Sequence, residues 1–295
     1  MAWVTHRPYV KLRQAVSYFG RGALAELRNG GWHGRDRRMR EGEASLTAQR
    51  VAAYRLSFDR LPTPYGDPAA DEALARNVAQ QVEVVPGGMH DYLRARTAFF
   101  DRVVVDALAA GIAQVVVGAA GYDGRAWRYG KPGVRWIELD HPTTQRDKLE
   151  RMHRLGLRTD HVCFVAADFA IDAVADRLVS AGLDVSSLCL FLLEGVAVYL
   201  DRPVLVSLLE GFRHVAADGS RLAISFSVMA SSTQRAARRA AFQAAVAAMG
   251  EPVRSVTKPG DIETLLAATG WQMVVASGHA SSSIGLVLAE TLSLG

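Results

Sequence analysis

The stretch that decides the fold runs from Gln114 to Arg125 and reads QVVVGAAGYDGR. Its three consecutive valines are typical of a strand that is buried on both faces, as in a parallel sheet. The glycines that follow let the backbone adopt positive φ and approach a ligand closely, although a simple tight turn would use them too. The spacing is not Gly-x-Gly-x-x-Gly, so the dinucleotide-binding fingerprint is missing. We therefore predict the first strand of an α/β fold, followed by a loop at a ligand site.

Apolar runs of the same character recur along the chain. Four of them alternate with segments of helical spacing, and this alternation predicts a doubly wound α/β sheet. Two closing runs, separated by Ser277–Ser283, predict an antiparallel hairpin. We expect seven strands, mostly parallel, with helices on both faces of the sheet. The runs are Val134–Leu139, Val162–Ala166, Leu188–Leu193, Arg221–Phe226, Trp271–Ala276 and Gly285–Glu290.

Residues 1–95 lack this regular alternation. Ser45–Phe58 and Asp71–Ala79 are plausible helices, and the proline-rich segment Leu61–Pro68 separates them. We predict an N-terminal helical cap or lid over residues 1–95 and a sheet domain over residues 96–295, together forming one structural unit. The segment Val228–Lys258 also lacks strand signals, and we expect it to complete the lid. A helix at Ala236–Met249 is predicted within it.

Composition narrows the class of protein. Apolar residues make up 49% of the 295 positions and charged residues 22%, which excludes a disordered chain. The two cysteines, Cys163 and Cys189, form no Cys-x-x-Cys pair, which excludes a secreted disulfide framework. We see neither a secretory signal nor a membrane span in the sequence. These features predict a protein of the reducing cytoplasm.

Charge is distributed unevenly. Residues 1–40 contain nine Lys or Arg against two acids, a net +7, so residues 41–295 carry −3 of the total +4. A basic arm can attract nucleic acid or an anionic substrate. We favour a solvated extension and expect no nucleic-acid partner. The arm has no zinc-finger or helix-turn-helix signature, and the rest of the chain is not basic.

Acidic residues follow the predicted strands, whose carboxyl ends would meet at one edge of the sheet. Asp140 comes 19 positions after Gly121, where an acid can accept hydrogen bonds from both ribose hydroxyls. It could instead cap the helix that begins near Pro142. Asp168 could hold an adenine amino group while the adjacent Phe169 packs on the base. Taken together, these positions favour one nucleoside-binding pocket. The alternative is that each acid separately caps a helix or stabilises a loop.

Blocks of residues in the same order resemble the leucine carboxyl methyltransferase-like family. These proteins are class I S-adenosylmethionine (SAM)-dependent methyltransferases, many of them bacterial O-methyltransferases. The resemblance extends from about residue 45 to residue 271. Its blocks are Arg96-Thr97 with Phe100-Asp101, Gln114–Arg125, Glu138–Gln145 with Lys148, Ala167-Asp168, Glu194–Val196 and Tyr199-Leu200.

The resemblance implies a Rossmann-like class I methyltransferase fold with SAM as cofactor. The implied cofactor-binding residues lie around the strand ends. They are Arg96 for the methionine carboxylate, Gly118, Ala119 and Gly121 in the loop, Asp140 for the ribose, Asp168 and Phe169 for adenine, and Glu194 near the methionine amino group and the reacting centre. Glu194 directly follows the apolar run Leu188–Leu193, so we expect its carboxylate to be buried. A buried carboxylate needs a positively charged or hydrogen-bonding partner.

The chain departs from the family pattern in three places. The family usually has Gly-Ala-Gly-x-Asp-Thr-Arg, whereas here Ala119 replaces the first glycine and Gly124 replaces the threonine. His141 stands where glutamine is common. The loop path can therefore differ slightly, but no charged cofactor contact is lost.

The implied activity is a SAM-dependent O-methyltransferase acting on a small or carrier-borne metabolite, in specialised (natural-product) metabolism. A carboxylate acceptor is already ionised, whereas a hydroxyl acceptor needs a base. Glu194, Tyr199 and His141 are the catalytic candidates, and His90 is a further group that could face the acceptor. A capping or surface role is the plainer alternative for each histidine. No cluster has metal-ligand spacing, so we expect no metal.

Two rival functions stay open. One is an NAD(P)-dependent oxidoreductase, which the missing fingerprint and the terminal hairpin disfavour. The other is a non-catalytic SAM-binding or nucleic-acid-binding protein that uses the basic arm. The sequence does not identify the methyl acceptor or the oligomeric state.

Overall fold

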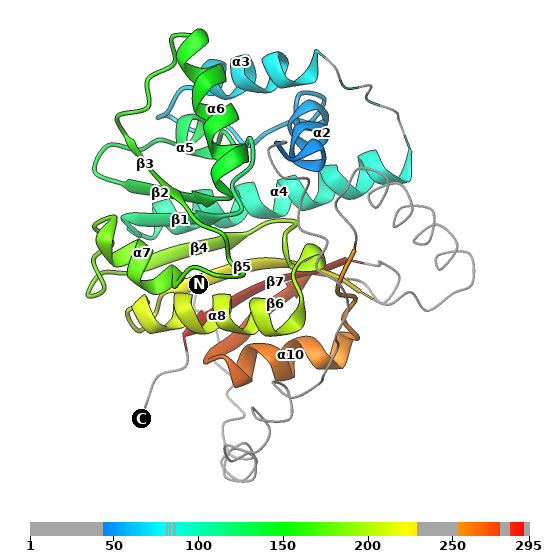
Figure 1. The fold of residues 1–295 in the computed structure, drawn as a ribbon, viewed down its shortest axis with the longest axis vertical. Helices are drawn as coiled ribbons and strands as arrows, with labels where there is room; N and C mark the ends of the chain where they lie inside the picture. Colours follow the sequence, from blue (N-terminus) through cyan, green and yellow to red (C-terminus); the bar gives the residue numbers. More distant parts are fainter. Residues whose placement is uncertain are drawn as a thin grey trace, which may run out of the picture. The chain divides into compact units, whose positions relative to one another are not determined.

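Seven strands pair into one sheet in the order β3-β2-β1-β4-β5-β7-β6 (Figure 1). All neighbouring strands are parallel except the pairs β5–β7 and β6–β7, which are antiparallel. The predicted mostly parallel sheet with a C-terminal antiparallel hairpin is therefore confirmed. The computed structural model describes residues 44–80, 82, 84, 87–228, 253–277 and 284–291. The basic arm and the helix predicted at Ala236–Met249 lie outside these residues.

The elements follow one another in strand–helix alternation from residue 114 onward. The strands are β1 (Gln114–Gly118), β2 (Arg135–Asp140), β3 (Val162–Ala166), β4 (Cys189–Leu193), β5 (Arg221–Ser227), β6 (Trp271–Ser277) and β7 (Ile284–Thr291). The helices are α2 (Leu46–Arg55), α3 (Pro68–Ala79), α4 (Gly88–Ala109), α5 (Arg125–Arg128), α6 (Pro142–Arg154), α7 (Val174–Ser180), the 3₁₀ helix η1 (Ala197–Tyr199), α8 (Arg202–Val215) and α10 (Pro259–Ala268).

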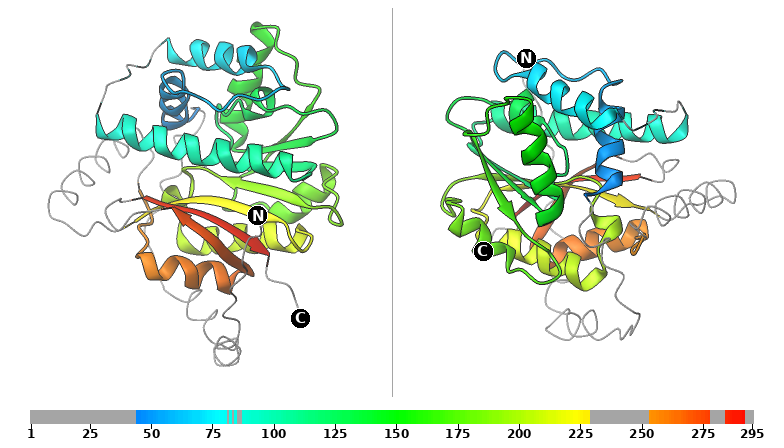
Figure 2. Two further views of the ribbon diagram at one scale, coloured as in Figure 1. Left: turned by 180° about the vertical axis from the view of Figure 1, so that it is seen from behind. Right: turned by 45° about the horizontal axis from the view of Figure 1, so that its top comes forward.

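Helices cover both faces of the sheet, as predicted (Figure 2). Side chains along β1 alternate between two cores because successive residues of a strand point to opposite faces. Val116 packs in the core formed with α7, α8 and α10, whereas Val115 and Val117 pack in the core formed with α3, α4, α5 and α6. All three valines are buried, which explains the unbroken apolar run.

The loop after β1 is fixed by close packing and unusual backbone angles. A Cβ on Gly118 would lie 2.7 Å from Leu193 Cδ2, so a larger residue there would displace the Leu193 side chain. Ala119 has φ 53°, a left-handed conformation that strains a residue with a side chain. The amide of Ala120 donates to the carbonyl of Leu139 at 3.1 Å, which ties the loop to β2. The loop therefore lies at the carboxyl edge of the sheet, where α/β folds bind ligands.

Helix α2 lies against this loop. Ser45 caps the helix by accepting from the Ala48 amide at 3.0 Å, and its own amide donates to Thr144 Oγ1 at 3.2 Å. A Cβ on Gly121 would lie 2.8 Å from Ala48 Cβ. The described part of the predicted cap is thus anchored beside the strand ends, and the predicted boundary at residues 95 and 96 falls inside α4.

We expect Gly121→Ala to destabilise the protein more than Gly133→Ala. Both glycines have positive φ, so both variants incur backbone strain, but nothing lies within 4 Å of a Cβ on Gly133. The clash with Ala48 should add about 1–3 kcal/mol, the usual range for overpacking. Denaturant unfolding of the two variants measures the difference, and equal losses would show that α2 does not press on the loop.

Candidate active site

A network of buried ion pairs converges on Glu194, the residue directly after β4. Its Oε2 lies 2.6 Å from Arg125 Nη1 and 2.9 Å from Arg55 Nη2, and its Oε1 lies 3.0 Å from Arg96 Nε. Burial pushes the pKa of Glu194 upward, but the charges of the three arginines outweigh it and hold that pKa well below the ordinary value. The three arginines therefore favour the ionised form of Glu194.

Arg125 joins Glu194 to two more buried carboxylates. Its Nη1 lies 2.5 Å from Asp123 Oδ2, and its Nε lies 2.7 Å from Asp101 Oδ1. Arg60 binds Asp101 from the other side with its Nε and Nη2 atoms. Burial raises the pKa of Asp101, yet Arg125 and Arg60 bring it below the ordinary value. Positive and negative groups thus alternate through the network.

Arg96 projects from α4 toward the same point. Its Nη1 donates to the hydroxyl of Tyr92 at 3.2 Å, and its guanidinium lies 5.2 Å from the centre of the Tyr92 ring. Burial lowers the pKa of Arg96, whereas Tyr92, Glu194 and Tyr199 raise it, and the net result is above the ordinary value.

Asp140 ends β2 and holds the loop rather than capping a helix. Its Oδ2 accepts from the Gly121 amide at 2.5 Å, and its Oδ1 accepts from the His141 amide at 2.6 Å. The N-cap of α6 is His141, whose Nδ1 accepts from the Thr143 amide at 3.4 Å. The alternative of Asp140 as the cap is therefore wrong. Each carboxylate oxygen has a further lone pair, so Asp140 can still accept from ligand hydroxyls.

Asp168 and Phe169 follow β3 on the same edge of the sheet. Asp168 Oδ1 accepts from the Ala170 amide at 2.9 Å, and the Asp168 amide donates to Asp172 Oδ2 at 2.8 Å. Phe169 is half-buried against the core. These two hydrogen bonds fix the loop after β3, and they use one of the two carboxylate oxygens of Asp168.

The two histidines have local roles. His141 caps α6, as described above. His90 Nε2 lies 3.1 Å from Ser57 Oγ, and its ring packs edge-on against Phe58 at 5.1 Å between centroids. These contacts match the plainer alternative for each residue, and catalytic roles for His141 and His90 stay predictions.

The family model for leucine carboxyl methyltransferase matches residues 47–213. The chain belongs to this family. It is 30% identical over 266 residues to a candidate SAM-dependent methyltransferase of Mycobacterium marinum, covering 83% of this chain and 86% of that protein. It is 39% identical over 139 residues to a candidate SAM-dependent methyltransferase of Mycolicibacterium paratuberculosis, covering 46% of this chain and 43% of that protein. The protein is accordingly a SAM-dependent methyltransferase.

A solved structure shares the fold. A candidate methyltransferase from Thermobifida fusca superposes with a TM-score of 0.55 at 16% identity, covering 86% of this chain and 97% of that one. The predicted Rossmann-like methyltransferase fold is confirmed.

The ion-pair network around Glu194 also contains charged residues that were not among the predicted site residues. Arg125 lay within the quoted motif, and its position in that motif was its only signal. Arg55 stands in an alanine-rich helix without a diagnostic spacing, and only its contacts with Glu194 and Asp123 reveal its place. Within the described ranges, no group of three or more His, Cys, Asp and Glu residues is arranged to hold a metal.

A second buried ion pair lies beside the loop after β1. Glu138 Oε2 lies 2.6 Å from Lys148 Nζ, which also donates to the carbonyl of Asp123 at 2.7 Å. Glu138 Oε1 is buried and has no hydrogen-bond partner among the described residues. Burial outweighs the attraction of Lys148 and raises the pKa of Glu138 to about 7. The pair thus connects β2, α6 and the loop.

We expect the contribution of Glu138 to stability to fall as pH rises from 4.5, its ordinary pKa, to about 7. A carboxyl group with a raised pKa favours the folded state most below its ordinary value. At about 1.4 kcal/mol per pKa unit, the loss is about 3 kcal/mol.

The double variant Glu138→Gln, Lys148→Met lacks both groups and serves as the reference. Denaturant unfolding of the two proteins between pH 5 and pH 8 measures the change. If their free energies of unfolding run parallel over that range, the ionisation of Glu138 is not perturbed.

Proposed function

We propose that the protein transfers a methyl group from SAM to a carboxylate oxygen of a small or carrier-borne metabolite. The observation that carries this proposal is the commitment of Glu194 to three arginines. An anion held in this way is a poor proton acceptor at neutral pH. A carboxylate acceptor needs no base, so such a site suffices for it, whereas a hydroxyl acceptor would have to lose a proton.

The described residues suit the methionine end of SAM. Arg96 would bind the carboxylate through bidentate guanidinium geometry, and Glu194 would bind the ammonium group. Arg96 and Glu194 are paired with each other, so a positive and a negative group lie side by side in the site. The carboxylate and the ammonium group of methionine are likewise close together. Bound SAM supplies an electrophilic methyl group, and alignment of the acceptor provides most of the acceleration.

The other predicted residues would hold the nucleoside. Asp140 would accept from the ribose hydroxyls with its remaining lone pairs, and Asp168 and Phe169 would flank the adenine. Helix α2 packs over Gly121 and would exclude water from the methionine side. Tyr199 would orient the acceptor beside Arg96. These roles follow the positions of the side chains at the strand ends.

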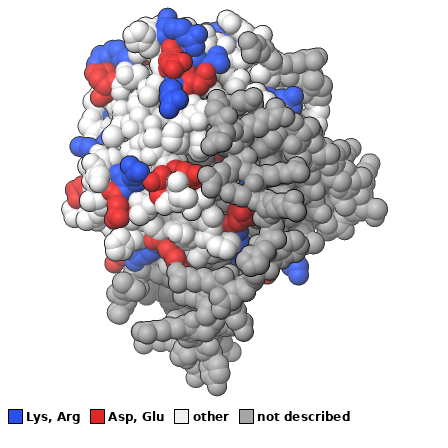
Figure 3. All heavy atoms as spheres, viewed as in Figure 1, with Lys and Arg blue, Asp and Glu red and all other residues white. Residues whose placement is uncertain are grey.

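A hydroxyl acceptor is the second candidate, because the phenol of Tyr199 is near Arg96. In either case we place the reaction in specialised metabolism. We also place it in the cytoplasm, whose reducing environment suits the free thiols of Cys163 and Cys189. No helix within the described ranges is long and apolar enough to cross a membrane. On the face drawn in Figure 3, Lys and Arg side chains lie beside Asp and Glu over the described elements, so the described part of this face differs from the basic patches that bind nucleic acid.

We expect Asp140→Asn to weaken SAM binding about tenfold to hundredfold, since it removes an acceptor for the ribose hydroxyls. Calorimetric titration with SAM measures the affinity. Asp160→Asn is the control, because the Asp160 side chain is 64% exposed and lies outside the site. Unchanged affinity in Asp140→Asn would remove the ribose assignment.

The acceptor chemistry is tested by incubating the protein with SAM labelled in the methyl group and a panel of carboxylic acids and phenols. Methyl esters release labelled methanol in mild base, whereas methyl ethers do not. We expect base-labile label on a carboxylic acid. Label that resists base would support the hydroxyl alternative, and transfer to neither class would contradict O-methylation.

A further inference from the structure

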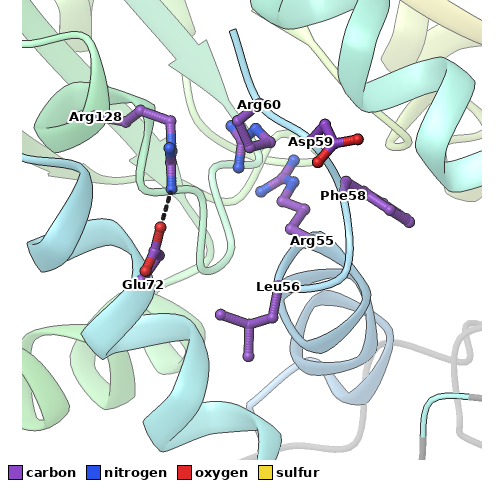
Figure 4. A pocket seen from close by; sticks show the side chains of 7 residues that line it. All are labelled: Arg55, Leu56, Phe58, Asp59, Arg60, Glu72 and Arg128. Atoms are coloured by element: carbon purple, nitrogen blue, oxygen red, sulfur yellow. Dashed lines mark hydrogen bonds and ion pairs between the residues drawn. The ribbon is translucent and has the colours of Figure 1, made fainter. Parts of the chain in front are cut away.

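Arg96 has fewer charged partners than the other arginines near the site. Among the described residues it pairs with one carboxylate, that of Glu194. The polar pocket at the end of α2 is lined by arginines that each pair with two carboxylates, namely Arg55, Arg60 and Arg128 (Figure 4). A further carboxylate therefore competes with fewer existing ion pairs at Arg96 than at any arginine of that pocket.

The guanidinium group of Arg96 keeps one nitrogen without a partner. Its Nε donates to Glu194 Oε1 at 3.0 Å, and its Nη1 donates to the Tyr92 hydroxyl at 3.2 Å. Its Nη2 forms no hydrogen bond with a described residue, and it is not among the enclosed atoms without a partner, a set that includes Arg55 Nε. Because Nη1 carries a second hydrogen, the Nη1–Nη2 edge can still donate two parallel hydrogen bonds to a carboxylate.

Tyr92 holds this guanidinium group through both its hydroxyl and its ring. It precedes Arg96 by one turn of α4, a spacing that places two side chains on the same face of a helix. The guanidinium lies 5.2 Å from the centre of the Tyr92 ring, within the range of a cation–π contact. The ring itself packs against the apolar cluster of Tyr54, Phe58 and Leu93. The position of Tyr92 therefore restricts the position of Arg96.

Gly195 provides the space that the guanidinium group occupies. A Cβ on Gly195 would lie 2.7 Å from Arg96 Nη1 and 3.0 Å from Arg96 Cζ. The backbone of Gly195 has φ 74°, and its amide donates to Ser225 Oγ of β5 at 2.7 Å. The residue after Glu194 is thus fixed to the sheet in a conformation that favours glycine. A side chain at this position would displace the end of Arg96.

We propose that Tyr92 and Gly195 are positioning residues that hold Arg96 with its Nη1–Nη2 edge directed at the methionine carboxylate of SAM. The inference rests on the proposed function, in which Arg96 binds this carboxylate. A long side chain binds an anion strongly only when neighbouring groups fix its rotamer before the ligand arrives. Tyr92 and Gly195 would supply this fixation without touching the cofactor themselves.

The proposal assigns the effect of these residues to one group of the ligand. Decarboxylated SAM lacks the carboxylate but keeps the sulfonium, the ammonium group and the nucleoside. A variant that merely loosens the fold weakens the binding of both ligands. A variant that misplaces Arg96 weakens the binding of SAM alone. The ratio of the two affinities therefore separates a positioning role from a structural one.

The first test is calorimetric titration of the full chain with SAM and with decarboxylated SAM. We expect Tyr92→Phe, which keeps the ring and loses the hydroxyl, to bind SAM about threefold to tenfold more weakly and decarboxylated SAM within about twofold of the wild type. Tyr65→Phe is the control, because the Tyr65 ring also lies beside a cation, with Lys131 Nζ at 5.7 Å from its centre. It should match the wild type for both ligands.

The second test compares Gly195→Ala with Gly182→Ala. Gly182 has φ 82°, and a Cβ there would lie 2.8 Å from Arg135 Nη1, so both variants strain the backbone and press on the end of an arginine. Arg135 begins β2, at the opposite end of the strand from Asp140. We expect Gly195→Ala to lower the preference for SAM over decarboxylated SAM about tenfold, and Gly182→Ala to leave it unchanged.

Equal losses for both ligands in Tyr92→Phe and Gly195→Ala would overturn the proposal, as would unchanged or tighter SAM binding. Arg96→Met separates this failure from that of the proposed function. If Arg96→Met keeps the preference for SAM, Arg96 does not bind the carboxylate, and both assignments are wrong. If Arg96→Met loses the preference while the other two variants keep it, only the positioning inference fails. None of these measurements involves the methyl acceptor.

Discussion

The structure around the site depends on burying charge only where the opposite charge meets it. An ionised side chain removed from water is stable only when it is paired and hydrogen-bonded. Replacing one partner of such a pair leaves the other charge buried without compensation for its desolvation. Arg125 illustrates the constraint, since it is fully enclosed and contacts three carboxylates from three different segments. The helices α2 and α4, the loop after β1 and the end of β4 are therefore held in one mutual arrangement.

Much of the fold follows from local signals in the sequence. The valines of β1, the apolar run of β4 and the Gly- and Ser-containing sequence between the last two apolar runs predict the sheet, because periodicity and turn-forming residues act over a few neighbours. The strand-end positions of Asp140, Asp168 and Glu194 follow from the same pattern. The hydrogen-bond and ion-pair partners of these carboxylates, however, do not follow from that pattern. Their partners lie 19 residues away in one case and 98 in another, and no local pattern encodes such contacts.

The departure at Gly124 has a structural explanation that a motif comparison cannot supply. A Cβ at this position would lie 1.9 Å from Asp71 Oδ1, so a threonine and this placement of Asp71 exclude each other. Asp71 in turn pairs with Arg60 and Arg128. The small residue in the loop thus leaves the space that Asp71 occupies when it forms these ion pairs. The alanine at position 119 has no such compensation, and its left-handed backbone is strained where the family has glycine.

Helix α2 is 10 residues long, shorter than the about 12–15 residues that an isolated helix needs to be even marginally stable in water. Its order must come from its contacts at Thr144, Gly121 and Glu194. A ligand ammonium that takes over Glu194 would compete with Arg55 for one of these contacts and loosen the end of the helix. Helix formation at the N-terminal edge of the site is then thermodynamically linked to occupancy, and the end of the helix would order again when spent cofactor leaves.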